Sequence, residues 1–383
     1  MLLIRDYNQG DVLLAHNASD ITLSCLDSSK IKMNIQYGST EISSFLKPLA
    51  GSISIPLSDI LKSLGCNVSF SNLTPVYGEK FSIPEVIIRF TDPDTDETVT
   101  WRKFVLGGGV DSGADVIEIL NDQWLTWRPQ ESVTSKTATE YLHCILPVEY
   151  KARTVSRADV YIDVYTVLSG RHTIQYRSLE PEDVPMLASI NASYSGLIRH
   201  ESLADIIADD IVAYDVYVDF HCSTDGVVSV FHKAIKPQRF ILRRLTGDTR
   251  YFLFRNSFGV FEGISATGGI TRKLQGEVST FVGSGGEEGI VDNGAITSYE
   301  INTGFISSER QLTLWTDFLK SSDHYLVRND FIPRKIIIES PDIQFLMKTV
   351  DSLTFEFRMA SQESGHHYQN KLLDYYDYDT AEL

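Results

Sequence analysis

The feature that most constrains the fold of this chain is an aromatic run from Arg250 to Gly263, with the sequence RYFLFRNSFGVFEG. Five of its side chains are aromatic, and their burial removes apolar area from water at roughly 25 cal/mol per Å². The central Asn256-Ser257 pair is typical of a turn. The run therefore predicts two short strands that form a hairpin inside a packed core, and it holds no arrangement of reactive groups.

The composition agrees with a strand-rich protein. The chain has 383 residues, of which 43% are hydrophobic and 11% are aromatic, including 18 Tyr and 19 Phe. Aromatic residues favour pleated, half-buried surfaces, and this length suits two or three domains of about 100 to 200 residues each. We therefore expect a mainly β protein, built from two or three consecutive β-sandwich-like domains with a few short helices.

The net charge narrows the range of partners. Lys and Arg number 34 and Asp and Glu number 51, so the formal net charge is −17. Nucleic acids and anionic membrane surfaces are bound by clustered Lys and Arg, so we expect neither nucleic-acid binding nor membrane insertion. An acidic surface also keeps a strand-rich protein soluble and discourages pairing between sheet edges.

The cysteines and the N-terminus favour cytoplasmic synthesis. Cys25, Cys66, Cys144 and Cys222 are far apart in the sequence and form no C-x-x-C pair, which indicates buried thiols rather than a zinc or redox site. Two disulfides stay open if the protein is secreted. The first residues lack the pattern of a signal peptide, and no stretch approaches the ~20 apolar residues of a membrane span.

Turn signals divide the chain into four parts. Gly107-Gly108-Gly109 predicts a first boundary and Pro237 lies close to a second. A Tyr- and Asp-rich sequence after residue 360 predicts a mobile tail, or an arm that becomes ordered on a partner. The predicted parts are a β-sandwich-like domain over 1–107, a second over 108–237, a β-rich domain with one amphipathic helix over 238–360, and a flexible tail over 361–383.

The local patterns also predict individual elements. Ser308 and Gln311 form a capping box before a stripe of Leu312, Trp315, Phe318 and Leu319, which predicts the best helix of the chain. A shorter helix is expected over 56–65, with Ser58 or Asp59 as its cap, and weaker helices over 180–190 and 201–208. Glycines predict a flexible connection over 283–289. Strands are expected over 21–25, 31–37, 52–55, 85–90, 98–106, 124–127, 141–146, 158–168, 173–176, 211–220, 227–231, 334–339 and 353–358.

One acidic turn raises the question of a metal site. Asp92, Asp94, Asp96 and Glu97 lie between two predicted strands, and their oxygens suit Ca²⁺. Counted from Asp92, however, the sixth position of an EF-hand loop holds Glu97 instead of Gly, and the twelfth holds Lys103 instead of Glu. We interpret the segment as an acidic hairpin turn, and we predict no metal and no cofactor. The pair His366-His367 falls in the predicted tail and is interpreted as incidental.

Two tryptophans are the candidate ligand-binding residues. The spacing of Trp124 and Trp127 would place them on opposite faces of a strand, one in the core and the other free to stack on a sugar. Glycoside hydrolysis needs two carboxylates ~5 to 9 Å apart, and the many Asp and Glu residues do not discriminate for or against it. The sequence contains no G-x-S-x-G, P-loop or H-E-x-x-H motif, so no catalytic residue is predicted.

Four phrases carry a resemblance to a known group of proteins. WLTWRP at 124–129, YFLFRNSFG at 251–259, LWTDFL at 314–319 and LTFEFR at 353–358 are similar, in that order, to large uncharacterised proteins encoded in tail modules of phages and prophages of Bacteroides and related bacteria. The resemblance covers about 110–360. It implies a non-enzymatic virion part, such as a tail-tip or baseplate protein of β-sandwich modules, which self-associates and binds other tail proteins.

Three classes of function remain open from the sequence. The first is this structural part of a phage or prophage tail, made in the cytoplasm and assembled into a virion or phage-like particle as a homo-oligomer. The second is a carbohydrate- or receptor-binding β-sandwich protein of a phage or gut bacterial surface, which would contact host glycans. The third is a glycan-active enzyme, which requires paired carboxylates in a cleft.

Overall fold

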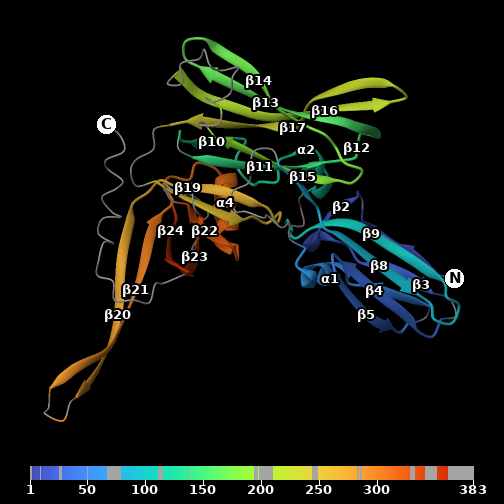
Figure 1. Ribbon diagram of the computed structural model, residues 1–383, viewed down its shortest axis with the longest axis horizontal. Helices are drawn as coiled ribbons and strands as arrows, with labels where there is room; N and C mark the ends of the chain where they lie inside the picture. The colour runs from blue at the N-terminus through green and yellow to red at the C-terminus, as the bar shows by residue number, and fades with distance from the viewer. Residues whose placement is uncertain are drawn as a thin grey trace.

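The computed structural model is mainly β, as expected, with its strands arranged in several sheets (Figure 1). No helix in the described part of the chain is long and apolar enough to cross a membrane. The described residues are 2–8, 10–25, 28–49, 51–66, 79–110, 115–136, 138–193, 197, 210–243, 249–282, 284, 287–327, 333–340 and 352–360.

The N-terminal region is a β-sandwich of a three-stranded sheet, order β1-β3-β6, and a five-stranded sheet, order β2-β9-β8-β4-β5. Buried apolar residues alternate with outward-facing ones along β3 and β4, which is the pattern of a sheet with one face in a core. The helix α1 adds Leu57 and Leu61 to this core and ends at Gly65, whose φ is +61°. The bounds are β1 Leu2–Arg5, β2 Val12–Leu14, η1 Ala15–Asn17, β3 Ile21–Cys25, β4 Ile31–Tyr37, β5 Thr40–Leu46, β6 Ser52–Ile55, α1 Leu57–Leu64, β8 Glu85–Thr91 and β9 Thr98–Leu106.

The middle region packs two sheets around the largest core. One has the order β11-β15-β7, and the other has the order β10-β17-β16-β13-β12, with β14 paired to β13. Alternate residues of β13, such as Val160, Ile162 and Val164, fill the core between the sheets. The bounds are β7 Glu79–Ser82, α2 Val116–Asp122, β10 Glu131–Thr134, β11 Thr139–Leu146, β12 Glu149–Tyr150, β13 Arg153–Thr166, β14 Gly170–Leu179, β15 Met186–Ser193, β16 Ile211–Thr224 and β17 Val227–Leu242.

The C-terminal region is one antiparallel sheet, order β19-β18-β22-β23-β24-β21-β20, with helix α4 packed on it. The aromatic run forms the hairpin β18–β19, and the ring of Phe318 from α4 lies 5.5 Å from Phe252 and 5.4 Å from Phe254, centroid to centroid. The strands β20 and β21 extend far from the rest of the sheet (Figure 1). The bounds are β18 Arg250–Arg255, β19 Phe261–Ala266, β20 Ile270–Val282, β21 Glu288–Asn302, α4 Glu309–Lys320, β22 His324–Val327, β23 Pro333–Ser340 and β24 Thr354–Met359.

Three local expectations are wrong. The segment 124–127 is no strand, because its backbone leads through a loop between α2 and β10. The expected helix over 180–190 is instead a turn followed by β15, which pairs with β11 and places Leu187 and Ile190 in cores. Helix α1 starts after Pro56 without a side-chain cap, so neither Ser58 nor Asp59 has that role. The segments 201–208 and 361–383 and most of 283–289 lie outside the described residues.

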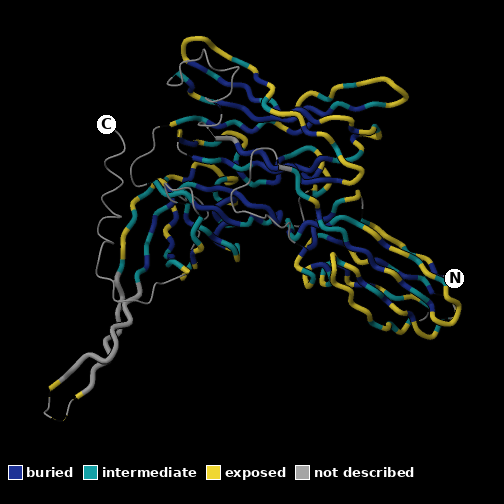
Figure 2. The backbone as a smooth tube through the Cα atoms, viewed as in Figure 1, coloured by how far each residue is buried: buried dark blue, intermediate teal, exposed yellow. Residues whose placement is uncertain are grey.

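The three regions interlock more tightly than a row of separate domains. The strand β7 comes before residue 107 in the sequence, yet it pairs with β15 of the middle region. The boundary expected at Pro237 falls inside β17, which continues to Leu242. A fourth apolar cluster draws residues from all three regions, among them Leu14, Leu187 and Phe258. Figure 2 shows buried segments gathered among intermediate ones where the regions meet.

The cysteines follow the sequence expectation. All four are buried and free, and none forms a disulfide. Burial raises the pKa of Cys144 to about 12, so this thiol stays protonated at neutral pH and is a poor nucleophile. These residues therefore serve as small apolar core groups.

Candidate functional site: a buried junction between the three regions

The three consecutive glycines at 107–109 mark a tight contact rather than a loose linker. A Cβ added to Gly108 would lie 2.1 Å from the backbone O of Ser257, and one added to Gly109 would lie 2.3 Å from Cβ of His16. The backbone N of Gly109 donates to the O of Ser257 at 2.6 Å, and the N of His16 donates to the O of Gly108 at 2.9 Å. The glycines thus allow the N-terminal sandwich and the β18–β19 turn to meet at the backbone.

The loop that contains both candidate tryptophans packs against the same turn. Trp124 is 5% exposed and belongs to the core of the middle region. Trp127 is half-buried, its ring centroid lies 5.1 Å from that of Phe258, and its Nε1 donates to Oγ of Ser257 at 2.7 Å. Trp124 is thus a core residue of the middle region, while Trp127 packs between regions. Their predicted role in ligand binding stays a prediction.

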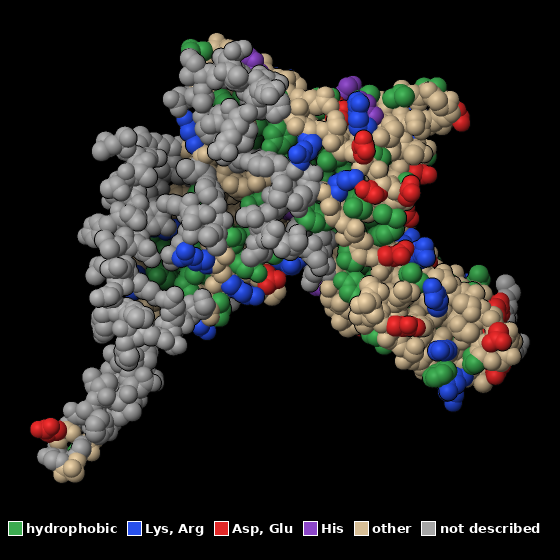
Figure 3. Space-filling view, viewed as in Figure 1, with side chains coloured by type: hydrophobic (Ala, Val, Ile, Leu, Met, Phe, Trp, Pro, Cys, Tyr) green, Lys and Arg blue, Asp and Glu red, His purple; other side chains and the backbone are tan. Residues whose placement is uncertain are grey.

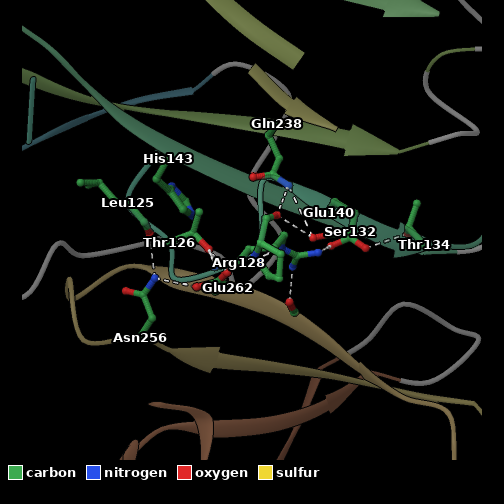
Figure 4. Close-up of polar contacts among 12 residues, drawn as sticks. Leu125, Thr126, Arg128, Ser132, Thr134, Glu140, His143, Gln238, Asn256 and Glu262 are labelled. Atoms are coloured by element: carbon green, nitrogen blue, oxygen red, sulfur yellow. Dashed lines mark hydrogen bonds and ion pairs between the residues drawn. The ribbon is translucent and has the colours of Figure 1, made fainter. Parts of the chain in front are cut away.

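Next in this loop, Arg128 is buried and faces two carboxylates (Figure 4). Its Nη1 lies 2.7 Å from Oε2 of Glu140 on β11, and its Nε lies 3.6 Å from Oε1 of Glu262 on β19. Its Nη2 donates to the backbone O of Gly263. One guanidinium therefore ties the loop, the middle region and the C-terminal hairpin to one another.

Neutral side chains complete this buried network. Asn256, in the β18–β19 turn, donates from Nδ2 to Oε2 of Glu262 at 2.9 Å and to the backbone O of Leu125 at 2.8 Å. The hydroxyl of Thr126 donates to Oε1 of Glu262, and that of Thr134 donates to Oε1 of Glu140 at 2.7 Å. Every carboxylate oxygen of the pair thus has a donor or a cation beside it, as buried charge requires.

The charges of the junction do not balance if both acids are ionised. Arg128, Glu140 and Glu262 are 6%, 3% and 1% exposed, so two carboxylates would share one cation away from water. Burial raises the pKa of Glu262 to about 7, although Arg128, Asn256 and Thr126 all favour its ionised form. Glu262 therefore holds a proton in much of the population at neutral pH.

Two further titratable groups border the network. His143 on β11 is buried, and its Nε2 lies 2.7 Å from the backbone O of Phe261, so this nitrogen carries the proton and donates. Burial lowers the pKa of His143 to about 4, which leaves the ring neutral at pH 7. Asp317 on α4 accepts from the backbone N of Ser257 at 2.9 Å, and burial raises its pKa to about 6.

The sequence reasoning missed Arg128, Glu140 and Glu262. One signal was present, because Glu262 interrupts an apolar strand in which its neighbours on both sides are buried. A lone acid in such a strand indicates a buried partner. Its cation, Arg128, lies more than 100 residues away in the sequence, so that partner could not be read from local spacing.

A second carboxylate cluster covers the outer face of the large middle sheet. Asp159 lies opposite Asp219, and Asp163 lies opposite Asp215, in the pairing of β13 with β16. We call these four residues the carboxylate ladder. Between the two pairs, Tyr161 and Tyr217 stack with centroids 5.6 Å apart.

Each acid of the ladder has a basic side chain beside it, which is an arginine for three of them and only a histidine for Asp219. Arg171 lies 2.6 Å from Asp163 and Arg239 lies 2.7 Å from Asp215. Asp159 contacts Arg157 and His221, and Asp219 contacts His232. Like charges opposite one another in a sheet are destabilising, and these partners offset that repulsion.

The acidic turn at 92–97 forms local hydrogen bonds and is not arranged as a metal site. The acidic turn at 92–97 uses the carboxylate of Asp92 to accept from Ser28 at 2.6 Å and from the N of Asp94 at 3.0 Å. Across the described residues, no three His, Cys, Asp or Glu side chains are grouped to hold a metal ion. The predicted absence of a metal stays a prediction, because parts of the chain lie outside those residues.

A shallow hollow of about 420 Å³ lies between α2 and the turn that joins β12 to β13. Three of its acids already have structural partners. Asp115 accepts from two backbone N–H groups at the start of α2, Glu118 pairs with Lys236 at 2.7 Å, and Asp122 accepts from the hydroxyl of Tyr150 at 2.9 Å. The hollow therefore supplies no opposed pair of uncommitted carboxylates among these three acids.

The comparisons with known proteins leave the chain without a family. No family model matches it, and no curated protein matches it. Among solved structures, it is similar to one from a study of the host cell surface retention of a 1.5-MDa bacterial ice-binding adhesin. That match has 10% identity, covers 79% of this chain and 92% of the other, and has a TM-score of 0.16, which is too low to carry an argument.

Proposed function

We propose that this chain is a non-enzymatic structural component of a phage or prophage tail, of the tail-tip or baseplate kind. The observation that carries the proposal is the junction, where one buried network and one shared apolar cluster join three sheet regions. Such a joint suits a part that must keep its shape under load. The acidic surface and the resemblance of four sequence phrases to phage tail-module proteins support the same role.

The location of the phrases within the fold adds to this support. Three of the four phrases meet at the junction, through Arg128, Ser257 and Asp317. A likeness concentrated in these phrases is thus a likeness in how regions are joined, which is the property that an assembly component depends on.

The test is to find the chain in particles. Antibodies against it would be applied to particles released from cells that encode it, followed by immunogold electron microscopy of the tails. We expect gold at one end of the tail, and the chain to sediment with particles after washing in salt. Recovery of the chain only in the particle-free fraction would overturn the proposal.

A further inference from the structure

The outer face of the five-stranded N-terminal sheet carries more cations than anions, against the net charge of the chain. In the register of this sheet, Lys32 lies opposite Phe45 and Thr91, and Arg89 lies opposite Thr100. Residues that face one another across strands share one side of a sheet, so these side chains all point away from the core. We define the basic face as Lys30, Lys32, Arg89 and Arg102.

Two acids lie beside the basic face and neutralise part of it. Glu85 lies 3.2 Å from Arg102, and Glu41 on β5 accepts from the side chain of Asn34. Within the strands, three cations against these two anions leave an excess of one positive charge, and Lys30 just before β4 adds another; the acidic turn at 92–97 lies beyond the end of the face. Lys32 and Arg89 are exposed, and Figure 3 shows Lys and Arg side chains interspersed with Asp and Glu side chains on the N-terminal sandwich at the lower right.

An exposed aromatic ring extends this face. Phe45 is 57% exposed, and Nζ of Lys30 lies 3.7 Å from its ring centroid. The β5 strand that carries Phe45 is an edge strand, because it pairs only with β4 within the described sheet. The surface thus combines cations, a ring and a sheet edge, and it suits an extended segment that is both acidic and aromatic.

The chain itself contains a segment of that chemistry. After residue 360, the sequence SQESGHHYQNKLLDYYDYDTAEL holds five acids and a single lysine. It also holds four tyrosines, which bind Lys and Arg through their ring faces. We propose that this segment, 361–383, of one copy binds the basic face of a second copy.

The position of β24, the strand that precedes the segment, favours binding to a second copy over binding to the same copy. The segment follows β24, and Figure 1 shows β24 and the N-terminal sandwich on opposite sides of the molecule. The 23 residues of 361–383 would have to extend around the body to reach the face of their own copy, and ordering them on that route costs conformational entropy. A neighbouring copy presents the same face directly. Repetition of this head-to-tail contact builds a ring or a filament.

The test uses full-length chains and charge reversal at exposed positions. Sedimentation velocity at about 50 mM salt would compare the wild type with K32E/R89E and with R177E, a matched control in which an exposed arginine of β14 is reversed. We expect K32E/R89E to weaken self-association by about tenfold or more, while R177E changes it less than about twofold. Circular dichroism would confirm that each variant is folded.

A complementary reversal makes the test specific to this pair of surfaces. The variant D374K/D377K/D379K gives the segment a basic character and should also weaken self-association by about tenfold. A mixture of this variant with K32E/R89E should associate again, because each surface then meets an opposite charge.

Two results would overturn the proposal. One is that the wild type stays monomeric at low salt. A monomer in which cross-linking joins the segment to the basic face of the same copy would count as this result. The other is a mixture of the two variants that fails to associate although both are folded. Neither result bears on whether the chain is found in tail particles, so the two proposals fail separately.

Discussion

The junction and the carboxylate ladder use the same chemical groups in opposite ways. In the junction, one arginine serves two carboxylates that are 1% to 3% exposed. In the ladder the carboxylates are buried as well, but the arginines that pair with three of them, Arg157, Arg171 and Arg239, keep 41% to 50% of their side chains exposed. Water reaches the arginines of the ladder but not the arginine of the junction, so an ion pair in the ladder should contribute less energy than one in the junction.

The difference also separates two structural purposes. The ladder lies within one sheet, where it allows two strands rich in acids to pair at all. The junction network connects segments more than 100 residues apart, so its geometry is correct only when the middle and C-terminal regions have docked. We infer that the junction specifies how the regions fit together, while the ladder tunes one sheet.

The largest effect is expected from the substitution R128M. It leaves Glu140 and Glu262 buried without their cation, and the free energy of unfolding should fall by about 3 to 5 kcal/mol. Urea denaturation at pH 7 would measure it. The triple variant R128M/E140Q/E262Q, which removes the charges together, should recover at least part of the loss. A single substitution that costs less than about 1 kcal/mol would contradict the buried-network account.

The next effect is a change in pH dependence with E262Q. The pKa of Glu262 is about 7 in the folded chain against an ordinary value of 4.5, so the folded state binds more protons between these pH values. This group therefore stabilises the fold below about pH 4.5 relative to high pH, and the contribution is lost as the pH rises through about 7, by up to about 3 kcal/mol. The stability of E262Q minus that of the wild type should rise over this interval.

His143 and Asp317 also titrate in this pH range, and they change the free energy of unfolding in opposite directions as the pH rises. The pKa of His143 is lowered to about 4 from 6.5, so its contribution is present above pH 6.5 and is lost as the pH falls towards 4. Asp317, with its pKa raised to about 6, follows Glu262. The comparison must therefore use the difference between E262Q and the wild type, measured by chemical denaturation at several pH values. A difference that is flat from pH 4.5 to 8 would contradict the assignment.

A smaller effect is expected from steric pressure at the junction. In G108A, the added methyl group meets the backbone O of Ser257 at 2.1 Å, and the resulting displacement should cost about 1 to 3 kcal/mol. The matched control is G269A, where no atom lies within 4 Å of the added Cβ. Thermal unfolding should show a lower Tm for G108A but not for G269A, each compared with the wild type. Equal Tm values for all three would contradict the expected steric cost at Gly108.

The smallest effect is expected in the ladder. R239M removes a pair in which two nitrogens of Arg239 reach both oxygens of Asp215, at 2.7 and 2.8 Å, but the arginine is 41% exposed. The loss should be below about 1 kcal/mol and should shrink in high salt. If R239M cost as much as R128M, the contrast between the two clusters would disappear.

Local patterns were enough to find the elements whose residues act on near neighbours. The strand Ile31–Tyr37 was predicted to the residue, because apolar and polar residues alternate in its sequence as its burial does in the fold. Helix α4 was predicted from its capping box, and Ser308 indeed accepts from the N of Gln311. The loop at 124–127 was mistaken for a strand because tertiary packing buries its aromatic residues, Trp124 in the core of the middle region and Trp127 against the apolar cluster that the regions share. The junction could not be predicted from local patterns, because no sequence feature near Arg128 identifies Glu262 as its partner.

The pairing of β7 with β15 has a consequence for how the chain is made. Ser82 on β7 meets Met186 on β15, so the first strand leaves the ribosome about 100 residues before its partner exists. At typical rates of synthesis that delay is roughly 5 to 20 s. During this time the N-terminal sandwich can fold around its own core, while β7 has no β15 to pair with and its backbone hydrogen-bonding groups stay exposed. The nascent chain should therefore be most vulnerable to aggregation and proteolysis at this strand, before translation reaches the middle of the protein.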